Sequence, residues 1–180
     1  MSIKHALLGF LSWRPFTGYE LKKMIAGSES LYWSGNNNQI YTTLVQIHQE
    51  GLVTNEVQQQ EHYPARKVYT ITEKGLAELR AFVLAAPDLP QLRNTFLIQL
   101  AWADQLSGAE LDEMIANYIE EVDLRIRMLV EKGHRPAYMP ARTGREVFLW
   151  EKITQNLIAM YQNELNWVRS MQKELHKKGF

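Results

Sequence analysis

The chain has 180 residues, of which 46% are hydrophobic and 22% are charged, and its 20 Lys and Arg residues balance 20 Asp and Glu residues. This composition is ordinary for one good-sized globular domain or two small ones, and it excludes a disordered chain. No apolar run reaches the roughly 18 residues that a membrane span needs, and the first residues lack the pattern of a signal peptide. We therefore expect a cytoplasmic protein with no membrane partner. Because the chain has no cysteine, disulfides and thiolate chemistry are excluded.

The first third of the chain predicts three short helices. Residues 3–12 are almost all apolar, as in a short buried helix, and the Arg-Pro pair that follows ends it because proline disfavours helical backbone in the preceding residue. Thr17 can cap a second helix over about residues 18–26. A third helix should begin near the asparagines at 36–38, which can cap free amides, and apolar residues then recur at helical spacing as far as Gly51.

A two-stranded hairpin and a fourth helix should follow. Residues 52–58 and 67–71 contain the β-branched and aromatic residues typical of strands, and the polar segment between them holds Pro64, which fits only a loop. Thr72 can then cap the fourth helix. Two prolines shortly beyond that helix mark a domain boundary, so we predict a first domain over residues 1–86.

Residues 91–180 predict a second domain made of long helices. Its first helix should begin near Asn94 and end near Gln105. The segments 107–110 and 143–146 have the capping-box pattern, and each should open a longer helix. The last of these helices can run almost to the end of the chain.

The last helix carries an apolar arc that is wider than one small domain can cover. Two adjacent stripes of apolar side chains run along it, and a partner chain is the simplest cover, so we expect a homodimer. A helix folded back on its own domain is the alternative. The residues assigned to the dimer interface are Trp150, Ile153, Leu157, Tyr161, Leu165 and Val168.

Four short motifs occur in a characteristic order and spacing along the first domain. They are Gly18-Tyr19-Glu20-Leu21, Gln39-Ile40-Tyr41 with Leu44, Glu50-Gly51-Leu52-Val53, and Tyr69-Thr70-Ile71-Thr72-Glu73-Lys74-Gly75. Together they resemble the winged-helix domain of the PadR-like transcriptional regulators over about residues 3–85. The helical tail resembles the longer-tailed, virulence-activator-like branch of that family in length and layout.

The resemblance implies a mostly α fold class. The N-terminal domain would be a winged helix-turn-helix with a two-stranded β-hairpin wing, and the C-terminal domain would be a long-helix dimerisation domain. The implied function is a sequence-specific DNA-binding transcriptional regulator, expected to be a repressor, that acts as a homodimer on a palindromic operator. Two third helices would enter successive major grooves of double-stranded DNA, and the wings would lie on the flanking backbone.

The DNA-binding residues are assigned from this arrangement. Polar side chains on the outer side of the third helix, including Thr43, are candidates for contacts to base edges, and basic residues of the hairpin and the second helix are candidates for phosphate contacts. Tyr41 could reach a phosphate or pack on the neighbouring helix. The assigned residues are Asn37, Asn38, Gln39, Tyr41, Thr42, Thr43, Gln46, Arg66, Lys67, Lys22 and Lys23.

The chain departs from the family where a regulator would hold the phosphates. The family usually has a proline after the Ile-Tyr pair and basic residues on the next turn, whereas this chain has Thr42, Thr43, Val45 and Gln46. Phosphate contacts from this helix should therefore be weaker than in a typical member. The alternative function is a dimeric, protein-binding sensor or adaptor whose winged helix has weakened DNA affinity.

No arrangement of residues indicates catalysis, a metal or a cofactor. The five histidines are scattered, and no Gly-rich phosphate loop or nucleophile motif occurs, so we expect a protein that is not an enzyme and has no cofactor. The tryptophans leave room for a small aromatic effector held between aromatic faces near the dimer axis. Its candidate residues are Trp102 and Trp150, and packing within the core is the alternative for both.

Overall fold

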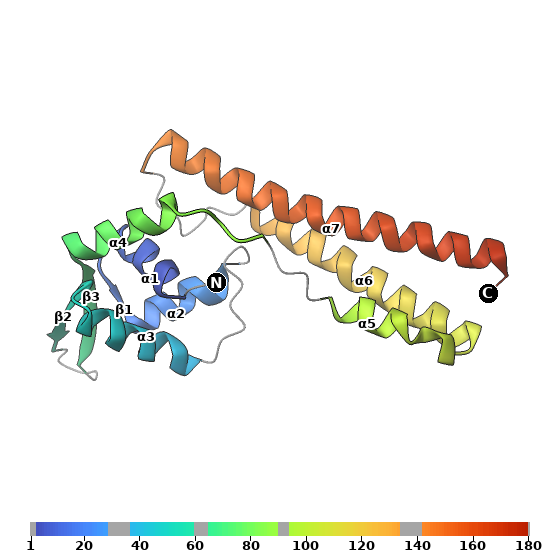
Figure 1. Cartoon of the computed structure of the whole chain (residues 1–180), viewed down its shortest axis with the longest axis horizontal. Coiled ribbons are helices and arrows are strands. Elements are labelled where there is room, and N and C mark those ends of the chain that lie inside the picture. The colour runs from blue at the N-terminus through green and yellow to red at the C-terminus, as the bar shows by residue number, and fades with distance from the viewer. Residues whose placement is uncertain (1–2, 29–36, 60–64, 90–93, 134–141, 180) are drawn as a thin grey trace. The chain divides into compact units, whose positions relative to one another are not determined.

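The computed structural model describes residues 3–28, 37–59, 65–89, 94–133 and 142–179. The fold is mostly α with a small antiparallel sheet, as the sequence predicted (Figure 1). The chain divides into two compact units, Met1–Asp88 and Leu89–Phe180, which we describe one at a time. Within the described part of the chain, no helix is both long and apolar enough to cross a membrane.

The N-terminal unit is a winged helix. Its elements in chain order are α1 (Ile3–Leu11), β1 (Phe16–Thr17), α2 (Gly18–Gly27), α3 (Asn37–Gln49), β2 (Val53–Gln58), β3 (Arg66–Ile71) and α4 (Glu73–Leu84). The sheet has the order β1-β3-β2, and both strand pairs are antiparallel. The sequence predicted the β2–β3 hairpin but missed β1, because two residues are too few to show an alternating pattern. Asn36 and Pro64, expected as a cap and a loop residue, lie outside the described residues.

The core of the N-terminal unit takes one apolar face from each of its first three helices. Leu7, Leu21 and Leu44 have no exposed surface, and they belong to one cluster with residues of the sheet. α1 packs against α3 and α4, and α2 packs against α3. Because the apolar stripe of each amphipathic helix is buried in this way, the opposite face of α3 is left to solvent.

Hydrogen bonds and two glycines form the joint between α3, the sheet and α4. Gly51 has a φ of +71°, which places the turn after α3 in the left-handed region. The Thr72 amide donates to the Leu52 carbonyl over 3.0 Å, and the Thr72 hydroxyl donates to the Gly51 carbonyl over 2.8 Å. The Gly75 amide donates to the Thr72 hydroxyl, which confirms Thr72 as the cap of α4. A Cβ on Gly75 would overlap the Leu52 carbonyl oxygen.

The C-terminal unit consists of helices packed lengthwise. Its described elements are α5 (Thr95–Ala101), the short 3-10 helix η1 (Ala103–Gln105), α6 (Gly108–Gly133) and α7 (Gly144–Lys178). α6 and α7 are antiparallel, since Asp112 near the start of α6 meets His176 near the end of α7 at 2.7 Å. The helix expected to continue to Gln105 ends at Ala101, because Trp102 leaves helical geometry with φ −114° and ψ 9°.

The two predicted capping boxes differ in the structure. At the start of α6 the prediction is confirmed, because the Ser107 amide donates to the Glu110 carboxylate over 2.8 Å and the Glu110 amide donates to the Ser107 hydroxyl. At the start of α7 the Thr143 hydroxyl accepts from the Glu146 amide at 3.0 Å. A capping box also requires the Glu146 carboxylate to accept from the Thr143 amide. It accepts instead from the backbone amide and the guanidinium of Arg142, so that part of the prediction was wrong.

A small core joins the helices of the C-terminal unit and corrects two dimer assignments. Phe96, Ile115 and Val168 are buried together, and the rings of Phe96 and Tyr118 stack with centroids 3.8 Å apart. Val168 and Leu165 were expected to face a partner chain. Both are buried in the single chain, because this stretch of α7 packs on α6, so their assignment to the dimer interface was wrong.

Candidate nucleic-acid interface

The exposed face of α3 is mostly polar and has no strongly charged group, although Val45 on the same face is apolar and 52% exposed. The helix contains no Lys, Arg, Asp or Glu residue between Asn37 and Gln49. The side chain of Asn37 lies outside the described residues, and the exposed polar residues of this face are Asn38, Gln39, Thr42, Gln46, His48 and Gln49. Such a face offers hydrogen-bond donors and acceptors, which is the chemistry that reads base edges.

Thr43 is not part of this face. Its side chain is 7% exposed, so the prediction that it lies on the outer side of the helix was wrong. Thr43 lies three residues after Ile40 and four before Ile47, and this spacing puts it on the buried stripe of α3. The neighbouring Thr42 is exposed, and its hydroxyl donates to the Asn38 carbonyl one turn earlier over 2.8 Å.

Tyr41 packs against α2 and also reaches solvent. A Cβ on Gly18 would lie 2.8 Å from Cε1 of Tyr41, so the ring lies directly on the bare backbone of that glycine. The Tyr41 residue is nevertheless 45% exposed. The structure therefore gives Tyr41 the packing role that the sequence offered as one alternative, while leaving part of the side chain accessible.

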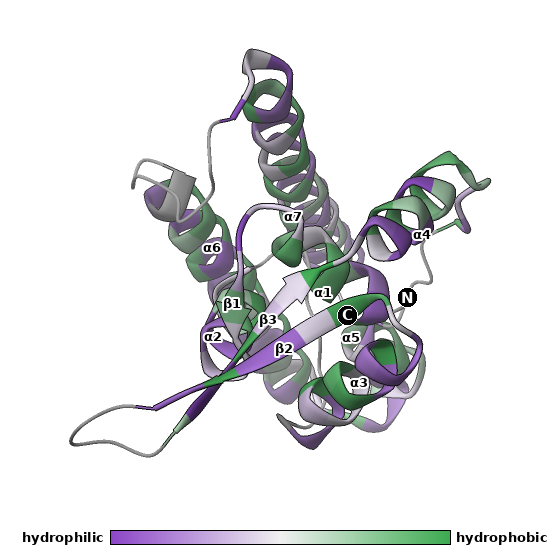
Figure 2. Cartoon of the chain, turned by 90° about the vertical axis from the view of Figure 1, so that its left-hand side faces the viewer, coloured by the Kyte–Doolittle hydropathy of each residue, from purple (hydrophilic) through white to green (hydrophobic). Residues whose placement is uncertain are grey.

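Two basic side chains, Arg66 and Lys67, lie at the start of β3, the second strand of the hairpin. Arg66 pairs with Gln58 across the strands, and the Arg66 Nε donates to the Gln58 Oε1 over 3.1 Å. Lys67 lies opposite Val57, and both residues are exposed. Figure 2 shows the hairpin projecting as a ribbon whose outer part has both hydrophilic and apolar segments. This is the geometry of a wing that can lie along a phosphate backbone.

The basic residues of α2 are less available. The Lys23 ammonium lies 4.6 Å from the centroid of the Tyr19 ring, a cation–π contact at an exposed site. Lys22 is half-buried. These two residues are therefore weaker candidates for phosphate contact than Arg66 and Lys67.

Sequence reasoning missed one acidic residue beside this interface. Glu50 follows the last residue of α3, and its carboxylate accepts from Nε2 of Gln46 over 2.7 Å. Its second oxygen accepts from Lys4 Nζ over 2.9 Å. The hydrogen bond from Lys4, supported by the one from Gln46, holds the pKa of Glu50 below its ordinary value. The spacing of four residues between Gln46 and Glu50 was the signal available in the sequence.

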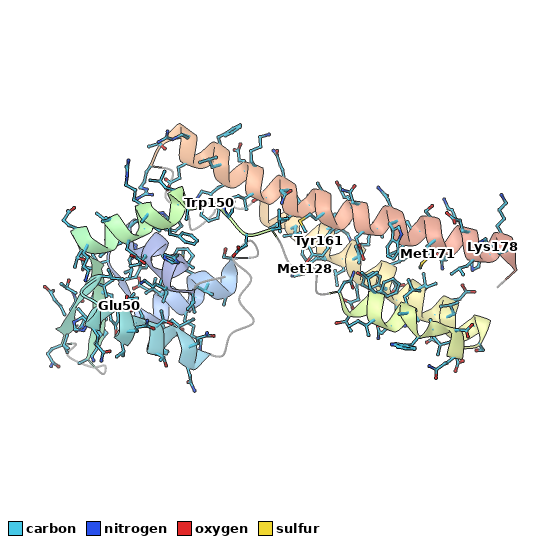
Figure 3. The ribbon with its side chains drawn as sticks, in the orientation of Figure 1. Glu50, Met128, Trp150, Tyr161, Met171 and Lys178 are labelled. Atoms are coloured by element: carbon cyan, nitrogen blue, oxygen red, sulfur yellow. The ribbon has the colours of Figure 1, made fainter. Side chains whose placement is uncertain are left out.

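The first half of α7 exposes several apolar side chains among its polar ones. Of the dimer residues assigned from sequence, Ile153 is 41% exposed, and Trp150, Leu157 and Tyr161 are half-buried. Phe148 and Leu149 are each 53% exposed in the first turns of the helix. Figure 3 labels Trp150 and Tyr161 along this helix, with Lys178 at its other end. An apolar surface of this extent is typical of a protein–protein interface.

The two tryptophans assigned to an effector do not share a site within one chain. Trp102 is 70% exposed and precedes α6, so it lies at the end of the antiparallel pair where α7 terminates. Trp150 belongs to the start of α7, roughly 40 Å away along that helix at 1.5 Å per residue. An open hollow of about 260 Å³ in this unit is lined by other residues, namely Phe96, Gln99, Met114, Asn117, Tyr118 and Glu121. Among the described residues, no three His, Asp or Glu side chains gather as metal ligands would.

The two parts of the chain match two described families. The transcriptional regulator PadR-like family matches residues 7–81, and the virulence activator alpha C-terminal family matches residues 92–176. A probable transcriptional regulator of Mycobacterium tuberculosis is 30% identical over 130 residues, which cover 69% of this chain and 68% of that protein. The chain belongs to the PadR-like family. The family and its relatives are transcriptional regulators rather than enzymes.

Solved structures of PadR-like regulators share this fold. PadR of Bacillus subtilis in complex with operator DNA has a TM-score of 0.83 at 21% identity, covering 96% of this chain and 98% of that one. The same protein in complex with p-coumaric acid has a TM-score of 0.78 at 21% identity, with 97% and 98% covered. The virulence activator AphA of Vibrio cholerae has a TM-score of 0.72 at 24% identity, with 98% and 99% covered. Identities this low establish the fold alone.

Proposed function

We propose that this regulator is a sequence-specific DNA-binding repressor that acts as a homodimer on a palindromic operator. Residues 1–86 form its DNA-binding domain, and residues 91–180 form its dimerisation domain. The observation that carries the proposal is the exposed, mostly polar face of α3 in the same winged helix as a hairpin that exposes Arg66 and Lys67. The complex of Bacillus subtilis PadR with operator DNA supports it.

In this proposal, α3 and the wing have different tasks. The exposed face of α3 enters the major groove, where Asn38 and Thr42 in its N-terminal half and Gln46 one turn later contact base edges. Arg66 and Lys67 of the wing contact phosphates, which carry affinity but no sequence information. Since α3 itself has no Lys or Arg residue, the phosphate contacts of this proposal come from Arg66 and Lys67 of the wing.

The homodimer is proposed from the surface of α7. Trp150, Ile153, Leu157 and Tyr161 supply apolar side chains that solvent can still reach. Burying them against a second copy removes that surface from water, and each Å² of apolar surface buried contributes about 25 cal/mol. A two-fold dimer presents two α3 helices in symmetric positions, which is why the operator is a palindrome.

We also propose a small aromatic effector. Its support is the complex of Bacillus subtilis PadR with p-coumaric acid and the accessible tryptophans Trp102 and Trp150. A panel of planar aromatic acids should contain compounds that quench tryptophan fluorescence and also shift DNA affinity. If no compound does both, the effector is rejected, and these tryptophans serve packing or the dimer interface.

The experiment that tests the proposed function compares one α3 variant with one wing variant. An operator is first selected from random genomic DNA, and gel shifts are run with selected and scrambled duplexes at several salt concentrations. Gln46→Ala should weaken binding to the selected duplex alone, by about 1–3 kcal/mol. Arg66→Ala should weaken binding to both duplexes and reduce the slope of log affinity against log salt by about one per lost phosphate contact. Gln162→Ala, at an exposed glutamine on α7, is the control and should change neither.

A protein-binding adaptor is the second candidate function, and the absence of Lys and Arg from α3 is the observation that favours it. A helix without these residues lacks the phosphate contacts that usually dominate affinity for DNA. Wild-type protein that prefers neither duplex at low salt, and that is not retained on heparin, would make the adaptor the better conclusion.

A further inference from the structure

One side chain on the exposed face of α3 is tied to a chain of ionic contacts. The Gln46 amide nitrogen donates to Oε1 of Glu50 over 2.7 Å, and Oε2 of Glu50 accepts from the Lys4 ammonium over 2.9 Å. Lys4 also contacts Oε1 of Glu78 at 3.0 Å. These contacts link α1, the end of α3 and α4, and Figure 3 marks the position of Glu50 among them.

The Glu50 carboxylate decides which end of the Gln46 amide faces it. An ionised carboxylate only accepts hydrogen bonds, so the amide nitrogen must face it, and the reversed amide would bring two oxygens together. Lys4 stabilises the ionised form of Glu50 and occupies its other oxygen. Among the described residues, none makes a second hydrogen bond to the Gln46 amide. The amide oxygen and one amide hydrogen of Gln46 therefore remain available to a ligand.

An amide held in one orientation distinguishes the bases of the major groove. Adenine presents an amino donor at N6 beside an acceptor at N7, which match the free oxygen and the remaining N–H of such an amide. Guanine and thymine present acceptor oxygens, which face the amide oxygen unfavourably unless the amide reverses. Cytosine presents an amino donor at N4 but no acceptor beside it, so it can satisfy the amide oxygen and not the remaining N–H. In this chain, reversal would place the amide oxygen of Gln46 against the Glu50 carboxylate.

We propose that Glu50 is a positioning residue that makes Gln46 select adenine at one position of the operator. The inference rests on the proposed function, because that function assigns Gln46 to a base contact. Glu50 does not itself need to touch the DNA. Its effect on specificity passes through the orientation of the Gln46 amide, and Lys4 holds the carboxylate in place.

The test measures binding to a panel of duplexes that carry every single base-pair change in the selected operator. Wild-type protein and Gln46→Ala together locate the position that Gln46 reads, where the wild type should prefer adenine by about tenfold or more. Glu50→Ala should lose the preference at that same position and keep the preferences elsewhere. Glu78→Ala is the matched control, because Glu78 also binds Lys4 but makes no contact with Gln46.

The control separates positioning from stability. If Glu50 served only to anchor Lys4, Glu50→Ala and Glu78→Ala would show the same base preferences, and that result would overturn the inference. Glu50→Gln provides a second variant in case Glu50→Ala does not fold, since the new amide can donate or accept and should reduce the adenine preference in part. Retention of the full preference in Glu50→Gln would also count against it.

The outcomes distinguish this inference from the proposed function. If wild-type protein prefers the selected duplex but Gln46→Ala changes no single position, the inference fails while sequence-specific binding stands. If wild-type protein prefers neither the selected nor the scrambled duplex, the proposed function fails, and the inference fails with it.

Discussion

The two units of the chain bury their apolar residues to different extents. Seven of the large side chains that are fully buried belong to the N-terminal unit, among them Leu7, Leu21 and Leu44, whereas Ile115 and Val168 are the two in the described part of the C-terminal unit. Each of the first three helices of the winged helix has neighbours that cover its apolar stripe. The 35-residue helix α7 packs on α6 and meets α5 through a ring contact, and much of its apolar surface stays open.

This difference indicates how each unit obtains its stability. The N-terminal unit has a core that a single chain can complete, so its exposed α3 face is free to be polar and to meet a ligand. The C-terminal unit has a small core, and under the proposed function its remaining stability comes from a second copy. A change in the core of either unit should therefore act within the chain, and a change on the exposed apolar surface of α7 should act between chains.

The largest expected effect comes from a charge placed on the proposed dimer surface. Leu157→Glu should dissociate the homodimer, because each of the two copies would bury an unpaired carboxylate, at a cost of several kcal/mol. Light scattering at micromolar concentration should return twice the 21.0 kDa chain mass for the wild type and a single chain mass for the variant. Gln162→Glu, at an exposed position of the same helix, should remain dimeric. A Leu157→Glu protein that stays dimeric and helical would place the interface elsewhere.

A smaller effect is expected from crowding the joint of the winged helix. Gly75→Ala should destabilise the N-terminal unit by about 2–3 kcal/mol, since the new Cβ overlaps the Leu52 carbonyl and backbone must move. Urea unfolding followed by circular dichroism measures this loss. Gly9→Ala is the control, because a Cβ there meets nothing within 4 Å, and replacing a helical glycine should raise stability slightly. Equal unfolding midpoints for Gly75→Ala and the wild type would contradict the prediction.

The smallest effect is expected at a polar contact inside the C-terminal unit. The Tyr118 hydroxyl donates to Glu164 over 2.8 Å, and burial together with this bond raises the pKa of Tyr118 to about 12. The hydroxyl also accepts from Nδ2 of Asn94 over 3.3 Å. Tyr118→Phe should therefore cost about 1–2 kcal/mol at neutral pH, since it removes two hydrogen bonds of about 0.5–1.5 kcal/mol each. A raised pKa means that this contribution is complete below the ordinary value of 10.0 and is lost as the pH rises toward 12.

Unfolding midpoints at neutral and alkaline pH test the Tyr118 prediction. The variant should lose less stability than the wild type between pH 10 and pH 12, because the titrating hydroxyl is gone. Tyr19→Phe, at an exposed position of α2, should follow the wild type throughout. If the unfolding midpoints of Tyr118→Phe and the wild type fall equally between pH 10 and pH 12, titration of Tyr118 does not contribute to the pH dependence of stability.

Most helices could be predicted from the sequence because apolar spacing and capping residues agree along each segment. α3 and α7 begin and end near their predicted bounds, and Thr17, Thr72 and Ser107 act as caps. The short strand β1 could not be predicted, since its pairing with β3 depends on residues far along the chain. The end of α5 at Ala101 likewise could not be predicted, because the non-helical backbone of Trp102 has no signal in the local sequence.

The candidate site was predictable by element but not by side chain. The polar face of α3 followed from spacing, yet Thr43 was placed on the wrong side, because its polar side chain was given more weight than its spacing from Ile40 and Ile47. Leu165 and Val168 were assigned to a partner because the width of an apolar arc does not tell which part the chain itself covers. The proposed role of Glu50 depends on Lys4 of α1, which is 46 residues away in the sequence but in contact with Glu50 in the fold.

The joint of the winged helix makes the hairpin an exchangeable part. Leu52 and Thr72, on either side of the hairpin, are hydrogen-bonded to each other and to residues of α3 and α4. The Thr72 hydroxyl is also hydrogen-bonded to the Gly51 carbonyl, so both ends of the hairpin are anchored. A hairpin from another PadR-like regulator, spliced between these two residues, would leave the same anchors to hold it. Chimeras of this kind could combine the α3 face of one protein with the phosphate contacts of another without rebuilding the core.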